Sequence, residues 1–72
     1  MKELIEQAIR DVKNNRYSRQ DAMNLYAELR LSAEQETEEL VNSGNVMLRR
    51  IYFEALDELN HYVRQIPVKP TF

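Results

Sequence analysis

With 72 residues the chain has room for one small domain, and a domain of about this size buries only about 60% of the surface that its unfolded chain exposes. The chain contains no cysteine, so disulfides and thiolate metal sites cannot support that core, and packed helices or a second copy of the chain must do so. The formal net charge of -2 is not that of a strongly basic nucleic-acid-binding domain, and no apolar run reaches the length of a membrane span. We therefore expect a cytoplasmic homodimer with no membrane partner.

The first segment has the periodicity of an amphipathic helix, from about Lys2 to Asn14. Charged residues fill one face, and the opposite face carries the apolar residues Leu4, Ile5, Ala8, Ile9 and Val12. Asn14 and Asn15 suit the C-terminal end of this helix, because Asn tolerates the left-handed conformation that is common there. Ser18 is then expected to cap the next helix, with Asp21 completing a capping box.

A second helix is expected to begin near Arg19 and to bury Ala22, Leu25, Tyr26 and Leu29. An advance of about 100° per residue brings Ala33 and Leu40 onto the same line, so one continuous or gently kinked helix is predicted as far as Ser43. The alternative is a break after Arg30, because Leu31 falls opposite the stripe and Ser32 with Gln35 forms another capping box.

A turn is predicted at Ser43-Gly44-Asn45, with Gly44 as a left-handed cap and Asn45 as the N-cap of the last helix. That helix is expected from about Val46 to Gln65. One broad face of it carries Leu48, Ile51, Tyr52, Ala55, Leu56, Leu59, Tyr62 and Val63. Pro67 disfavours helix at the residue before it and therefore ends the element.

The predicted fold is all-α, with three helices. The last two are expected to form an antiparallel hairpin whose apolar faces suit a dimeric helical bundle. Residues 1–66 are assigned to one helical domain and residues 67–72 to a short extended tail.

Neither catalysis nor a cofactor is predicted. The chain lacks cysteine, a Gly-rich phosphate loop and a second histidine from which a nucleophile, base and orienting group could be assembled. Glu58-x-x-His61 has the spacing of di-iron ligands, but His61 lies more than about 120° from the apolar stripe of its helix, whereas bundle ligands point inward. We therefore expect no metal site and no enzyme activity.

Phe53 is an apolar outlier, because it falls about 130° from the centre of the core stripe of the last helix. Arg49, Arg50 and Arg64 lie near it, and an aromatic ring among arginines is typical of interface hot spots; the alternative is that Phe53 packs as ordinary core. We name Phe53 and the three arginines the Phe53 patch, the first candidate for binding a protein partner.

A second candidate is the acidic block formed by Glu34, Glu36, Glu38 and Glu39, since no Lys or Arg occurs between Arg30 and Arg49. The alternative reading is a solvated helix face. The predicted function is a small adaptor, regulator or inhibitor that binds another protein. The alternative function is a nucleic-acid-binding dimer that uses the basic residues Arg49 and Arg50 and the group Arg10, Lys13, Arg16 and Arg19.

Overall fold

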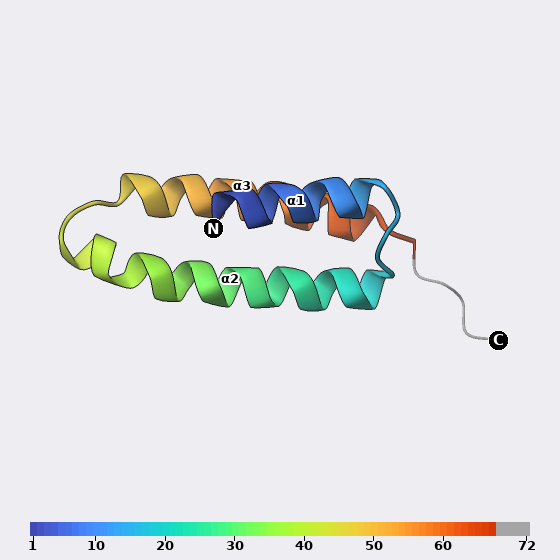
Figure 1. Ribbon diagram of the computed structural model, residues 1–72, viewed down its shortest axis with the longest axis horizontal. Coiled ribbons are helices and arrows are strands. Elements are labelled where there is room, and N and C mark those ends of the chain that lie inside the picture. Colours follow the sequence, from blue (N-terminus) through green and yellow to red (C-terminus); the bar gives the residue numbers. More distant parts are fainter. Residues whose placement is uncertain (68–72) are drawn as a thin grey trace.

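The computed structural model describes residues 1–67 and consists of three helices: α1 (Lys2–Lys13), α2 (Arg19–Asn42) and α3 (Met47–Gln65). The all-helical prediction is confirmed for these residues, among which there is no strand. In Figure 1, α2 and α3 lie side by side and run in opposite directions, while α1 lies against the half that is far from the α2–α3 turn. Within residues 1–67 no helix combines the length and apolar character needed to cross a membrane. Most of the predicted tail, residues 68–72, lies outside the described part.

Both helix ends of the α1–α2 connection follow from the local sequence. The N–H of Arg16 donates to the carbonyl of Asp11 at 3.0 Å, and Asn15 adopts a φ of 59°. Together these features form a Schellman motif, the common C-terminal end of a helix with one residue in the left-handed conformation. Helix α1 therefore ends at Lys13, and it is Asn15 that takes the left-handed conformation. The predicted cap of α2 is confirmed, because the Ser18 Oγ accepts a hydrogen bond from the N–H of Asp21 at 3.2 Å.

Helix α2 ends in the same Schellman motif, and α3 begins one residue later than predicted. Gly44 has a φ of 86°, and the N–H of Asn45 donates to the carbonyl of Leu40 at 2.8 Å. The prediction that Asn45 caps α3 was wrong, because Asn45 completes the end of α2 instead. The cap is Val46, which makes no side-chain capping bond, and α3 begins at Met47.

We expect Gly44→Ala to lower the free energy of unfolding by about 1 kcal/mol, since a side chain is strained at positive φ. Apart from its two chain neighbours, no residue in the described part of the chain has a heavy atom within 4 Å of the position that an added Cβ would take, so backbone strain sets this cost. Gly44→Asn is the matched control and should cost less, because Asn tolerates this conformation. Urea unfolding followed by circular dichroism measures both; an equal cost for Ala and Asn would contradict the left-handed turn.

Helix α2 passes through Ser32 without interruption, so the continuous-helix prediction is confirmed and the break does not occur. Its fully buried polar residue is Thr37, whose Oγ1 donates to the carbonyl of Ala33 at 2.6 Å. The hydroxyl is thus satisfied within its own helix and its burial leaves no polar group unpaired. Sequence reasoning missed Thr37 because it is polar, although its position four residues after Ala33 places it on the buried line.

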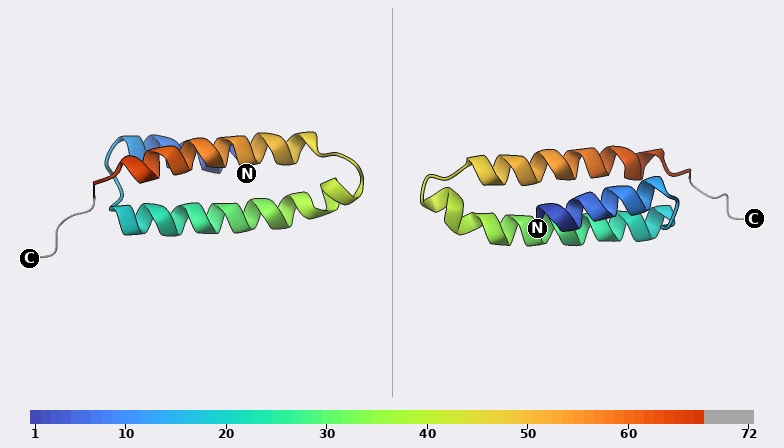
Figure 2. Two further views of the ribbon diagram at one scale, coloured as in Figure 1. Left: turned by 180° about the vertical axis from the view of Figure 1, so that it is seen from behind. Right: turned by 45° about the horizontal axis from the view of Figure 1, so that its top comes forward.

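The core lies where all three helices meet. Its buried apolar residues are Ile5, Ala8, Ile9 and Val12 from α1, Ala22, Leu29 and Ala33 from α2, and Leu56, Leu59 and Val63 from α3. In α3 every residue before Leu56 is half-buried or exposed, and the same holds in α2 after Thr37. The two views in Figure 2 show the reason: α1 accompanies only one half of the α2–α3 pair.

Candidate interaction surface

The predicted apolar stripe of α3 is covered at one end and open at the other. Leu56, Leu59 and Val63 are buried as predicted, whereas Leu48 is half-buried and Ile51 is 36% exposed. The apolar face predicted for α3 is therefore buried in its C-terminal half and uncovered in its first two turns. Helix α1 has 12 residues and α3 has 19, so α1 is too short to cover the whole stripe.

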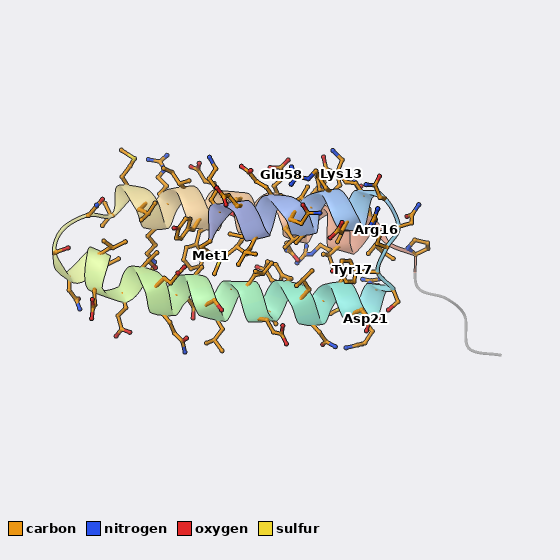
Figure 3. All side chains as sticks on the ribbon, viewed as in Figure 1. Met1, Lys13, Arg16, Tyr17, Asp21 and Glu58 are labelled. Atoms are coloured by element: carbon orange, nitrogen blue, oxygen red, sulfur yellow. The ribbon has the colours of Figure 1, made fainter. Side chains whose placement is uncertain are left out.

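The uncovered end of the stripe is the continuation of the surface that contacts α1. The ammonium Nζ of Lys13 in α1 lies 4.9 Å from the centre of the Tyr62 ring, which places α1 on the Tyr62 side of α3. At about 100° per residue, Leu48 and Ile51 lie within about 40° of Tyr62 around the α3 axis. Figure 3 shows Lys13 and Arg16 at one end of the molecule and Met1 near its middle, where α1 begins. Leu48 and Ile51 therefore extend the α1-binding side toward the turn.

Helix α2 contributes acidic residues to the same side. A hollow between α2 and α3 is lined by Met23 and Ala27 but by no α1 residue, so it opens on the side away from α1. Leu25 lies on the opposite flank of α2, and Glu36 and Glu39 fall within about 40° of Leu25 around the helix axis. Leu40 lies in the same stretch and is half-buried. We call the surface formed by Glu36, Glu39, Leu40, Leu48 and Ile51 the open face.

The Phe53 patch lies on the other flank and is only partly assembled. Phe53 is half-buried against the core, and the Arg49 guanidinium carbon lies 5.1 Å from the centre of its ring. Arg64 lines the hollow on the side away from α1. Arg50, by contrast, pairs with Glu54 at 3.1 Å. Part of the Phe53 side chain therefore packs against the core, as the internal-packing alternative expects, and the Arg49 guanidinium lies over its ring.

The acidic block divides into two pairs. Glu34 pairs with Arg30 at 3.4 Å, and Glu38 lies within about 40° of Glu34 around α2. Glu36 and Glu39 lie on the open face instead. Among residues 1–67 no ion pair involves Glu36, Glu38 or Glu39. The four glutamates therefore do not form one patch, because consecutive residues of a helix point in different directions.

The two basic groups lie at opposite ends of the molecule, one at the α1–α2 turn and the other at the start of α3 (Figure 1). Several members already have partners. Arg16 lies 3.8 Å from Asp11, and Arg10 donates to Gln7 at 2.9 Å. These residues therefore do not combine into a single basic face.

His61 is exposed, and its Nε2 lies 3.0 Å from the amide nitrogen of Gln65. In the described part of the chain, no group of three or more His, Asp or Glu side chains is arranged to hold a metal ion.

Comparison of the chain with protein-family models, with curated proteins and with solved structures gave no match. The open face combines apolar α3 side chains with acidic α2 side chains.

Proposed function

We propose that this chain is a protein–protein interaction module, acting as an adaptor, regulator or inhibitor, and that the open face is its binding surface. The observation that carries the proposal is the continuation of the α1-binding side of α3 into the uncovered residues Leu48 and Ile51. The exposed residue Met47 at the adjoining turn adds apolar surface there, since it lies about 40° from Ile51 around α3. Neighbouring apolar side chains left in water are typical of interaction sites.

Helix α1 indicates what kind of segment suits this side of the hairpin. It docks through Ile5, Ala8, Ile9 and Val12, the spacing with which an amphipathic helix presents one apolar stripe. A further helix laid end to end with α1 would meet Leu48 and Ile51 in the same way. This is the helix-in-groove mode of recognition, in which a few apolar anchors at helical spacing provide the contact.

Homodimerisation remains a prediction, because a chain of 72 residues forms a small core and gains from a second copy. Nucleic-acid binding also remains a prediction from the sequence. The separation of the basic groups to opposite ends favours protein binding over it, since phosphate backbones are bound by a continuous basic face.

Affinity capture from an extract of the source cells tests the proposal. We expect the wild-type chain to retain a protein that Ile51→Asp and the double variant Glu36→Lys, Glu39→Lys both lose. The matched control is Leu31→Asp, which places the same charge on a side chain that is 57% exposed on the outer side of α2. Circular dichroism shows whether each variant is folded, and the glutamate variant leaves the core untouched.

Two results would contradict the proposal. If the four chains retain the same proteins, the open face is not a binding surface. If the captured protein is lost only from a double variant Arg49→Ala, Arg64→Ala, the binding surface is the Phe53 patch instead.

A further inference from the structure

We infer that the open face binds an amphipathic helix that carries Lys or Arg beside its apolar stripe. The inference rests on the proposed function and specifies the chemistry of the partner. It follows from two independent properties of the face, its apolar side on α3 and its acidic side on α2.

The apolar side sets the size and periodicity of the bound segment. From Met47 to Ala55, α3 extends about 13 Å beyond the first buried residue of its core, which is about two and a half helical turns. A bound helix therefore has room for two or three anchors, at positions i, i+3 or i+4, and i+7. Leu48, Ile51 and Leu40 are the residues that these anchors would contact.

The acidic side sets the charge of the bound segment. Glu36 and Glu39 are one helical turn apart, and neither belongs to an ion pair among residues 1–67. Nearby cations are directed elsewhere: Arg30 pairs with Glu34, Arg49 lies over Phe53 on the other flank, and Arg50 pairs with Glu54. The α2 edge of the open face therefore carries two carboxylates without a Lys or Arg partner among residues 1–67. Lys and Arg on the bound helix would pair with the two glutamates while their methylene stems cover Leu40.

The same charges disfavour a second copy at this face. A second copy docked through the same face would bring the same two glutamates and no Lys or Arg of its own open face to pair with them. No Lys or Arg occurs in the chain between Arg30 and Arg49 to compensate them.

The test uses the full chain and two synthetic helical peptides with the same Leu and Ala stripe, one flanked by Lys and Arg and the other by Glu. Fluorescence anisotropy of labelled peptides measures the dissociation constants at low and at high salt. We expect the basic peptide to bind at least about tenfold more tightly than the acidic one, and its affinity to fall as salt screens the charges.

Variants of the chain test whether the peptide binds at the open face. Ile51→Asp should lower the affinity for the basic peptide at least about tenfold by removing an anchor contact. Glu36→Gln with Glu39→Gln should lower that affinity about threefold to tenfold at low salt. The glutamine variant changes no buried residue, so its result does not depend on whether Ile51→Asp folds. Leu31→Asp should leave the affinity unchanged.

Equal binding of the two peptides, absence of binding, or insensitivity to the glutamine variant would overturn the inference. Light scattering over a concentration series provides a further test: a wild-type dimer that Ile51→Asp converts to a monomer would identify the second copy as the occupant. Failure of the inference is distinguishable from failure of the proposed function. A chain that captures a protein through the open face but does not prefer the basic peptide retains the function and loses only the inferred partner chemistry.

Discussion

Replacing Ile5 by Asp is expected to unfold most of the protein at room temperature. Ile5 is fully buried, and within residues 1–67 helix α1 supplies four of the ten buried apolar residues of the core. Burying a carboxylate there without a partner, or undocking α1 to avoid it, should cost more than about 4 kcal/mol. A domain of 72 residues has a total stability of only about 4–11 kcal/mol. Circular dichroism and urea unfolding measure the loss.

The matched control is Leu4→Asp, one residue earlier, where the side chain is 60% exposed. Both variants place an acid in the first turn of α1, where its negative charge interacts favourably with the helix dipole to a similar extent. Leu4→Asp should therefore retain the helical signal and a cooperative transition. Similar stability for the two variants would mean that α1 is not docked through Ile5.

Leu59→Ala is expected to lower the free energy of unfolding by about 2–5 kcal/mol, the usual range for a fully enclosed leucine. Leu59 has no exposed surface and lies in the part of α3 that faces both other helices. Leu31→Ala is the matched control, with the same chemical change in a helix interior at an exposed site, and should cost less than about 0.5 kcal/mol. Urea midpoints, compared at a common denaturant slope, measure both effects.

Leu48→Ala extends this comparison to the open face. Because Leu48 is half-buried, the cost should fall between those of the other two leucine variants. A cost for Leu48→Ala equal to that of Leu59→Ala would contradict the open face, since it would mean that Leu48 is enclosed in solution.

The helices and their ends were largely predictable, because they depend on local chemistry. Ser18 caps α2 through a bond to a backbone N–H three residues away, and Gly44 and Asn15 stop the preceding helices by adopting positive φ. The error at Asn45 is also local. The N–H of Asn45 donates to the carbonyl of Leu40 and so completes the C-terminal end of α2. Sequence pattern alone does not distinguish a residue that ends one helix from a residue that caps the next.

The candidate site was less predictable, because it depends on which helix faces which. Periodicity placed Leu48 and Ile51 on the apolar stripe of α3 but could not show that α1 does not extend over them (Figure 3). The relative lengths of the helices, 12 and 19 residues, were the signal that could have indicated this. The acidic block is contiguous in the sequence but divides between two sides of α2 for a related reason, since adjacency in a helix is not proximity on its surface.

The most direct test of the open face as the binding surface is an NMR titration of the full, isotope-labelled chain with the basic helical peptide. We predict that the largest backbone amide shifts occur at Glu36, Glu39, Leu40, Leu48 and Ile51. The amides of Phe53 and Arg64, on the other flank, should change little. The largest shifts at Phe53, Arg49 and Arg64, with none at Leu48 or Ile51, would contradict the account and move the binding surface to the Phe53 patch.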